Sequence, residues 1–473
     1  MRLLFVKVFF CLIFVVILLI FVSGATIGTG WLPQIGEWSA RTIIYQDFDS
    51  VVNIRAQLET DPFGNLHLMW YREDESIMYS RWDGSHWTVP TDILLSPSGE
   101  RTYRAAFTID DNGGVHVVWG NNKALYYSFN RYDQAGNVAA WATPVILGPP
   151  SSAYAVTAKG EQVFLVYSAF GGELYSLTSQ DGGITWGEPI QISQSQHDAA
   201  TDEPRVFYDQ HEVLHVVWNS IPLPNGYPPS GIFYAQSTDQ ANSWSLPIQL
   251  DGEDMGQPNV AVAGDDTIHV VWNGRAGVGG RFHTWSADRG RTWQDIETIT
   301  LSTARLEGGL THPPSLTVDS SGTLHILFTT NSPGAIYTYW TGNQLVTPQL
   351  LVSVAEGNWW NEQALLYCAF GNQLHLIVMG ESAHMLWHSW ATLNVEAQSP
   401  LPTPQHTNAP SDINISPTAT PFATVTPDSP IAISAHPDVQ TGSGMEPVLL
   451  SLVPAMLVVI GVVTFYLRHN RRL

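Results

Sequence analysis

The chain has 473 residues, a formal net charge of −22 and only 20 lysines and arginines. Because a strongly acidic surface repels phosphate backbones, we expect no nucleic-acid partner. Tryptophan is abundant at 18 residues, cysteine is limited to 2, and long runs of helix-forming residues are missing, which argues against both an α-rich and a disulfide-stapled fold.

The first 25 residues have the features of a secretory signal. Basic Arg2 and Lys7 precede an apolar run from Val8 to Val22, and small residues follow it. This run falls short of a comfortable membrane span, so an uncleaved anchor is the less favoured alternative. Residues 1–25 are therefore expected to direct the chain out of the cell.

A repeat fills residues 31–393. Segments such as "GNLHLMWYR", "GGVHVVWGN" and "DTIHVVWNG" align on one anchor position, which recurs every 48 to 56 residues. The anchors are His67, His116, Phe164, His215, His269, His325 and His375. This period is typical of propeller blades, and each unit reads as four short strands that alternate or are fully apolar. The repeat predicts an all-β propeller with four antiparallel strands per blade.

The last repeat lacks a fourth strand, because it stops at "HMLWHSWATL". The segment from Glu37 to Ile44, "EWSARTII", fits the fourth-strand pattern of "TWGEPIQI" and "SWSLPIQL". An N-terminal strand is therefore expected to complete the last blade and to protect the sheet edges that an open ring would expose. We predict a seven-bladed propeller, with six or eight blades as the alternatives.

Three further segments follow the repeat. Residues 394–446 are rich in Pro, Thr and Ser and cannot bury a core, so we expect an extended stalk. Residues 447–467 include a long apolar run without a charge, which predicts one transmembrane helix. The basic tail 468–473 is expected to stay in the cytoplasm. These segments predict a single-pass membrane protein whose propeller lies outside the cell.

A short motif lies between the third and fourth strands of several repeats. "SQDGGITW" (Ser179–Trp186) recurs as "SADRGRTW" (Ser286–Trp293) and, weakened, as "STDQANSW" (Ser237–Trp244). The pattern resembles the Asp box, or BNR repeat, of the sialidase-like β-propellers. The aspartate is suited to accept backbone hydrogen bonds, glycine to supply a positive φ and tryptophan to fill the gap beside the next strand. We expect a structural role for Ser179, Asp181, Gly183, Trp186, Asp239, Trp244, Ser286, Asp288, Gly290 and Trp293.

The anchor histidines could suggest a metal site. They occupy the same position in different blades, however, and neighbouring blades diverge outward from the ring axis, so these side chains cannot converge on one ion. Buried core histidines are the favoured interpretation. No metal and no other cofactor is expected.

The resemblance implies a particular site on the loops that precede the first strands or join the second and third. Sialidases clamp a substrate carboxylate with arginines and use a tyrosine nucleophile with acidic residues. The residues of this chain brought forward for these roles are Arg55, Arg104, Arg205, Asp202, Glu203, Glu362 and Tyr367. The alternative, which we favour, is that these arginines pair with neighbouring loop acids. No Tyr–Glu pair can be placed by motif, and sialidases have six blades.

Trp359 and Trp360 in "GNWWNEQ" suggest a different use of the same loops. Exposed aromatic rings stack on sugars, so these residues are candidates for ligand binding, with packing at a blade junction as the alternative. The first hypothesis is therefore a membrane-anchored propeller that binds a glycan or a surface protein. The second is an exo-sialidase-like glycoside hydrolase, and the third is a structural subunit of an envelope assembly. The sequence leaves open whether the protein is an enzyme.

Overall fold

The computed structural model describes residues 35–46, 56–71, 76–95, 102, 104–169, 172–193, 199–222, 231–274, 280–299, 312–329, 334–353, 363–380 and 385–401. The expected signal peptide at 1–25, the transmembrane segment at 447–467 and the tail at 468–473 lie outside these ranges. Within the described ranges, no helix is long and apolar enough to cross a membrane.

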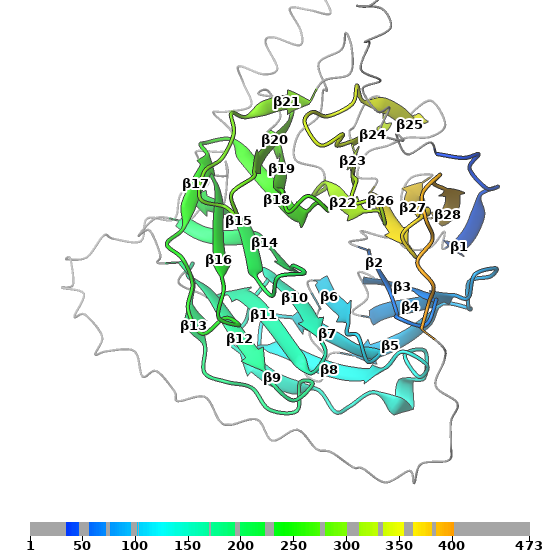
Figure 1. Cartoon of the computed structure of the whole chain (residues 1–473). Helices are drawn as coiled ribbons and strands as arrows, with labels where there is room; N and C mark the ends of the chain where they lie inside the picture. Colours follow the sequence, from blue (N-terminus) through cyan, green and yellow to red (C-terminus); the bar gives the residue numbers. More distant parts are fainter. Residues whose placement is uncertain are drawn as a thin grey trace, which may run out of the picture. The chain divides into compact units, whose positions relative to one another are not determined.

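Seven four-stranded antiparallel sheets are arranged around a common centre, as Figure 1 shows. Blade one comprises β2 (Gln57–Thr60), β3 (Leu66–Tyr71), β4 (Ser76–Trp82) and β5 (Thr91–Leu95). Blade two comprises β6 (Arg104–Ile109), β7 (Gly114–Gly120), β8 (Leu125–Arg131) and β9 (Val145–Gly148), with the 3-10 helix η1 (Val138–Ala140) before β9. Blade three comprises β10 (Tyr154–Lys159), β11 (Gln162–Ser168), β12 (Leu174–Ser179) and β13 (Ile190–Gln191).

Blade four comprises β14 (Ala199–Tyr208), β15 (Leu214–Pro222), β16 (Gly231–Ser237) and β17 (Ile248–Asp251). Blade five comprises β18 (Met255–Val262), β19 (Ile268–Gly274), β20 (Arg281–Ser286) and β21 (Glu297–Ile299). Blade six comprises β22 (Ser315–Val318), β23 (Leu324–Thr329), β24 (Gly334–Tyr339) and β25 (Gln349–Ser353). Blade seven comprises β26 (Ala364–Ala369), β27 (Gln373–Gly380), β28 (Met385–Thr392) and the N-terminal β1 (Thr42–Gln46).

The ring closes as the sequence predicts. Strand β1 pairs antiparallel with β28, with Thr42 opposite His388 and Gln46 opposite Met385. Backbone hydrogen bonds extend the seam toward the N-terminus, from Gly36 N to Thr392 O and from Ser39 N to Trp390 O. The predicted number of seven blades is confirmed, and six- or eight-bladed rings are not formed.

The core follows from the apolar second strands. Each of these strands has a blade on either side, so both faces are buried, and β19 has no exposed residue. The tryptophans that end the "LHLMW" and "HVVW" segments, Trp70, Trp119 and Trp272, are fully buried. Because each aromatic ring packs against an adjacent sheet, one position of the repeat supplies much of the inter-blade core.

All six anchor histidines are buried in this core. In blades one, two, four and six the ring hydrogen-bonds on one side to an aspartate six residues earlier and on the other side to a tyrosine of the third strand. We call these sets Asp–His–Tyr triads: Asp61–His67–Tyr79, Asp110–His116–Tyr127, Asp209–His215–Tyr234 and Asp319–His325–Tyr337. The expectation of core histidines therefore holds.

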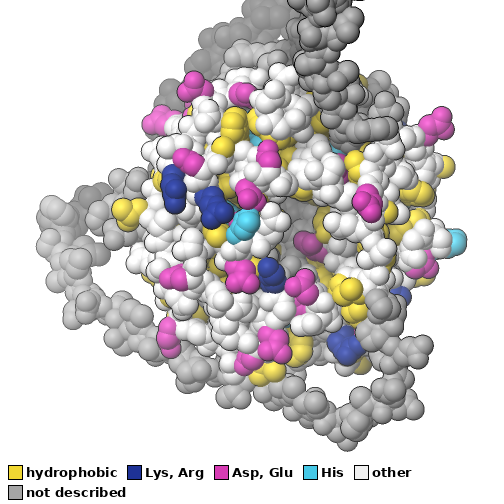
Figure 2. Space-filling model, viewed as in Figure 1, with side chains coloured by type: hydrophobic (Ala, Val, Ile, Leu, Met, Phe, Trp, Pro, Cys, Tyr) yellow, Lys and Arg dark blue, Asp and Glu magenta, His cyan; other side chains and the backbone are white. Residues whose placement is uncertain are grey.

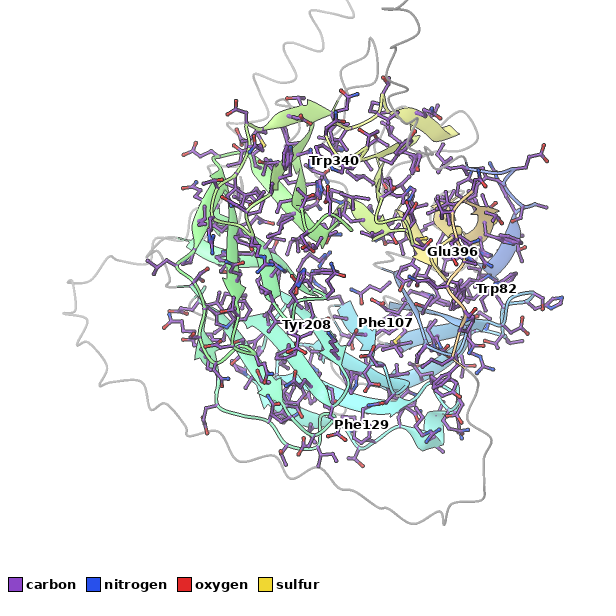
Figure 3. All side chains as sticks on the ribbon, viewed as in Figure 1. Trp82, Phe107, Phe129, Tyr208, Trp340 and Glu396 are labelled. Carbon is purple, nitrogen blue, oxygen red and sulfur yellow. The ribbon has the colours of Figure 1, made fainter. Side chains whose placement is uncertain are left out.

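Blades five and seven carry a different arrangement, which we call a histidine pair. His269 Nδ1 lies 2.9 Å from His283 Nε2, and His375 Nδ1 lies 2.9 Å from His388 Nε2. A tryptophan from the next blade packs edge-on against each pair: Trp340 against His269 and Trp82 against His388, both labelled in Figure 3. Blade three has neither arrangement, because Phe164 takes the anchor position and stacks on Tyr208 of blade four.

The Ser-x-Asp motifs form turns between the third and fourth strands. In the first copy, Thr185 donates its backbone N–H and its hydroxyl to Asp181, at 2.8 and 2.6 Å. The Ser179 hydroxyl donates to Asp181 and accepts from the N–H of Gly183, whose φ is 90°. The copies at Asp288 and Asp239 repeat these contacts, although in the last one Ala241 adopts the positive φ that glycine holds in the others.

The chain continues to pack on the ring after β28, past the expected boundary at residue 393. Gln398 N donates to Phe370 O of blade seven, and Leu401 N donates to Pro62 O of blade one, each at 2.7 Å. The Ser320 hydroxyl of blade six donates to Glu396 O. Residues 394–401 therefore run along the turns that join first and second strands, at the end of the ring that also carries the Ser-x-Asp turns. We call this end the turn face and the opposite end the loop face.

Candidate functional site

The described candidate residues all lie on the innermost strands of the ring. Arg104 begins β6 of blade two, Asp202, Glu203 and Arg205 lie on β14 of blade four, and Tyr367 lies on β26 of blade seven. These first strands surround the centre in Figure 1. The other candidates, Arg55, Glu362, Trp359 and Trp360, lie outside the described residues.

Two of the candidate arginines meet the carboxylate of Glu203. Its Oε2 atom lies 3.1 Å from Nη1 of Arg104 and 3.7 Å from Nη2 of Arg205. Asp202 adds a second carboxylate, with Oδ1 3.6 Å from Nη2 of Arg104. We call these four residues the arginine–carboxylate cluster, and it joins blades two and four across the ring.

Local backbone geometry creates this cluster. The register of β14 against β15 shifts between Asp202 and Arg205, and Glu203 has a φ of 48°. A bulge lets consecutive side chains of one strand turn toward the same partner, which a regular alternation would prevent. The Glu203 side chain is thereby only 4% exposed, in contact with Arg104 at 11%.

The electrostatics of the cluster are those of a satisfied ion pair. Burial disfavours the charge on Arg104, but the carboxylates of Glu203 and Asp202 outweigh that effect and raise the pKa of its guanidinium above the ordinary value. The hydroxyl of Tyr154 also donates to the backbone oxygen of Arg104, which ties blade three to blade two. Because a buried ion pair is expensive to break, Arg104 is committed to its internal partners.

A second group joins blades seven and one. The Tyr367 hydroxyl accepts from the backbone N–H of Thr60 at 3.2 Å, lies 3.0 Å from the Thr60 hydroxyl and lies 3.5 Å from Oε2 of Glu59. Burial raises the pKa of Glu59 to about 8, although the Tyr367 hydroxyl acts in the opposite direction. Burial and the nearby Glu59 also raise the pKa of Tyr367 above its ordinary value. Burial therefore favours the neutral, protonated form of the Glu59 carboxyl.

Sequence reasoning missed Glu59, although the repeat contains the signal that finds it. Glu59 is paired with anchor His67 in the sheet of blade one, as Tyr367 is paired with anchor His375 in blade seven. Both residues lie eight positions before their anchor. Since closure makes blades seven and one neighbours, the two positions come to lie side by side, and a motif search along the chain cannot see this.

Glu59, Tyr367 and Arg205 line one pocket of about 200 Å³ between the inner strands. Asn259 and Ser315 line it too, but they already bond to the ring: Asn259 donates to Pro314 O, and the Ser315 hydroxyl exchanges hydrogen bonds with Leu366. Figure 2 shows that the visible face is hollowed near the centre of the ring. We call this space the central pocket.

The central pocket has the residue types of a glycosidase without their poised states. A tyrosine nucleophile needs a base to remove its proton, and a neutral Glu59 beside a phenol of raised pKa does not supply one at pH 7. Within the described residues no group of three His, Cys, Asp or Glu side chains is placed to hold a metal ion. Glu59 and Tyr367 can both donate and accept hydrogen bonds.

Comparison with solved structures shows a β-propeller fold shared with saccharide-related proteins. The BP39L lectin from Burkholderia pseudomallei superposes with a TM-score of 0.53 and 14% identity, covering 76% of this chain and 99% of the lectin. An ulvan lyase, a polysaccharide lyase of family PL25, gives a TM-score of 0.51 and 10% identity over 77% of this chain and 96% of the lyase. The Trypanosoma rangeli sialidase gives 0.44 and 12% identity over 74% of this chain and 59% of the enzyme.

The likenesses to the lectin and the lyase show that the chain has a β-propeller fold. At such low identity they show the fold alone. No protein-family model matches the sequence, and no curated protein matches it.

Proposed function

We propose that the protein is a membrane-anchored extracellular propeller that binds a glycan and does not cleave it. The observation that carries this proposal is the arginine–carboxylate cluster. A sialidase needs arginines that are open to the carboxylate of a substrate, whereas Arg104 and Arg205 both lie against Glu203. A ligand that relies on an arginine clamp would have to displace that internal carboxylate.

A saccharide is the ligand class that the remaining features support. Two proteins that share the fold are named as a lectin and a polysaccharide lyase, and this likeness supports a saccharide ligand. The neutral acid of Glu59 can donate one hydrogen bond and accept others, which suits the hydroxyl groups of a sugar. The acidic chain, at −22, favours an uncharged sugar over a polyanionic one.

The place where the described chain ends supports the proposed tether. Residues 394–401 lead along the turn face to Leu401, and the Pro/Thr/Ser-rich stalk and the apolar segment 447–467 follow in the sequence. A chain that leaves from the turn face keeps the loop face clear for a ligand. Rigid rings that present variable loops at one end are common binding scaffolds.

The competing function is an exo-sialidase, and one observation favours it. Tyr367 and Glu59 form the Tyr–Glu pair that such an enzyme uses, and Arg205 lines the same pocket. The raised pKa of Glu59 argues against this function at neutral pH, because the carboxyl must be ionised to act as the base.

The two functions differ in what a fluorogenic sialoside reports. We expect the full chain to bind glycans on an array that carries neutral and sialylated oligosaccharides, and to release no fluorophore from a methylumbelliferyl sialoside between pH 5 and 9. Turnover that is lost in both Tyr367→Phe and Glu59→Gln would overturn the binding proposal in favour of the hydrolase. An array without a bound glycan would also overturn it.

A further inference from the structure

A larger cavity lies away from the central pocket, between blades three and four. It has a volume of about 610 Å³, and its lining comes from the end of β13, the start of β14, the strands β15 and β16, and residues 244–247, which precede β17. None of the residues that line it in the described part of the chain is charged. We call this cavity the blade three–four groove. Its size falls in the range of about 300 to 1,000 Å³ that is usual for ligand sites.

The groove exists because one fourth strand is unusually short. Strand β13 has 2 residues, Ile190–Gln191, whereas β9 and β17 in the neighbouring blades have 4. A short outer strand covers less of the adjacent blade, so part of the flank of blade four remains open beside Ile192 and Ser193. Figure 1 shows β13 at the periphery of the ring.

Aromatic side chains form the apolar side of the groove and are held in fixed orientations. Phe233 stacks on the buried Trp218, with centroids 5.8 Å apart and planes 16° from parallel. Trp244 donates its indole N–H across the seam to the Ser176 hydroxyl of blade three, at 2.9 Å. Both Phe233 and Trp244 are partly exposed, and Leu246 beside them is 87% exposed. Ordered rings lose little entropy when a ligand stacks on them.

Hydroxyl and amide groups form the polar side. The Thr201 hydroxyl donates to Gly172 O at 2.8 Å, which fixes it and leaves its oxygen lone pairs to accept. The exposed Gln191 donates its amide nitrogen to Ser193 O, which orients the amide oxygen as an acceptor. Ser220 contributes another hydroxyl to the lining. Fixed acceptors and aromatic rings in one lining match a molecule that has hydroxyl groups on its edges and C–H bonds on its faces.

We propose that the blade three–four groove binds a short segment of an uncharged oligosaccharide. The described residues of its lining carry no charge, so they offer no ion-pair partner to a sialylated or sulfated sugar. A peptide would bring backbone groups and mixed charges for which this lining offers no ion-pair partner. The inference rests on the proposed glycan-binding function and assigns it to the groove instead of the central pocket.

The test uses a matched pair of exposed apolar residues. Leu246 and Val89 hold the same place in the fourth-strand pattern, in "WSLP" and "WTVP", and they are 87% and 84% exposed. Leu246 lines the groove, whereas Val89 lies in blade one. The strongest neutral glycan found on the array would be titrated calorimetrically against the detergent-solubilised wild type, Leu246→Glu and Val89→Glu, with melting temperatures measured in parallel.

We expect Leu246→Glu to bind about tenfold more weakly and Val89→Glu to bind as the wild type, with all three chains equally stable. Phe233→Ala is a second groove variant and should weaken binding in the same way. Equal affinity of Leu246→Glu and wild type would overturn the groove while leaving the glycan-binding function standing. Binding only to sialylated glycans, lost in Arg205→Ala, would also overturn it. A wild-type chain that binds no glycan refutes both proposals.

Discussion

The four blades with Asp–His–Tyr triads and the two with histidine pairs use the same anchor position in different ways. In a triad blade, the aspartate six residues before the anchor is hydrogen-bonded to one ring nitrogen. Oδ2 of Asp319, for example, lies 3.1 Å from Nε2 of His325. In the histidine-pair blades that position is Ala263 or Ala369, and Nε2 of His269 and His375 has no hydrogen-bond partner among the described residues.

The difference shows that two positions of the repeat change together. Where the third strand offers a tyrosine, the turn supplies an aspartate, and where the third strand offers a histidine, the turn supplies an alanine. In a pair one imidazole accepts from the other, so the two rings cannot both be protonated. A triad tolerates charge through its carboxylate. In blade five, Oε2 of Glu297 lies 3.4 Å from Nδ1 of His283, whereas the pair of blade seven has no carboxylate partner among the described residues.

The pKa values follow this division. Burial lowers the pKa of His67, but Asp61 acts in the opposite direction. In blade seven nothing opposes burial: it lowers the pKa of His388 to about 4, and burial together with the adjacent His388 lowers that of His375 well below its ordinary value. Since His388 pairs with Thr42 of β1, the unprotected pair lies on the seam that closes the ring.

The largest effect is expected from breaking a triad. Asp319→Ala should lower the free energy of unfolding by about 4 kcal/mol, because it removes the partner of a fully buried His325 and frees the N–H groups of Ser321 and Thr323. Urea unfolding at pH 7, followed by tryptophan fluorescence, measures the loss.

Asp319→Asn is the control, since its amide oxygen can still accept from the N–H groups of Ser321 and Thr323, while its amide nitrogen takes the place of Oδ2 beside Nε2 of His325. It should recover the part of the stability that the turn contributes. If Asp319→Ala lowers the free energy of unfolding by less than about 1 kcal/mol, the triad contributes little to stability. Triads and histidine pairs would then not differ in how they stabilise their blades.

A smaller loss of stability is expected when the pH is lowered. Because the folded pKa of His388 is depressed to about 4, the unfolded chain binds more protons below its ordinary value of 6.5. Stability is therefore complete above about pH 6.5 and falls as the pH is lowered, with a loss from this residue of about 2 kcal/mol at pH 5. Unfolding free energies measured between pH 7 and 4.5 test this slope.

The reciprocal exchange isolates the cause. Ala369→Asp with His388→Tyr rebuilds a triad in blade seven and should flatten the slope, whereas Asp319→Ala with Tyr337→His installs a pair in blade six and should steepen it. Equal slopes in both variants would mean that the acid sensitivity arises elsewhere.

The sequence predicts the fold well because the fold depends on local and repeated features. The anchor spacing sets the number of blades, and the resemblance of Glu37–Ile44 to other fourth strands predicts the closing strand, confirmed by its pairing with β28. Both signals lie in strand patterns that recur in every blade, so each copy supports the others.

The site could be predicted only in part, because it depends on which side chains meet across the ring. The sequence favours pairing of Arg104 and Arg205 with loop acids, but the contact of both with Glu203 depends on the bulge in β14, which no local pattern encodes. The blade three–four groove depends on the shortness of β13, which has only 2 residues. The shortness of a strand is not marked by any sequence motif, so neither Phe233 nor Leu246 could be identified from the sequence.

The smallest loss of stability is expected from replacing Asp181, a partly exposed turn aspartate, in contrast to the buried Asp319. Asp181 accepts from the Ser179 hydroxyl and from Thr185, and these hydrogen bonds outweigh its partial burial and lower its pKa. Water can replace most of these bonds, so Asp181→Ala should cost only about 1 kcal/mol at pH 7, well below Asp319→Ala. Its stabilising contribution should begin to fall below the ordinary carboxyl value of 3.8 and should be lost as the pH passes through the lower pKa of the folded state. Thermal melts of the two variants at pH 7 and 3.5, with glycan titration at pH 7, measure all three quantities. Weaker glycan binding by Asp181→Ala at unchanged stability would contradict its role as a turn residue, because the turn face would then take part in recognition.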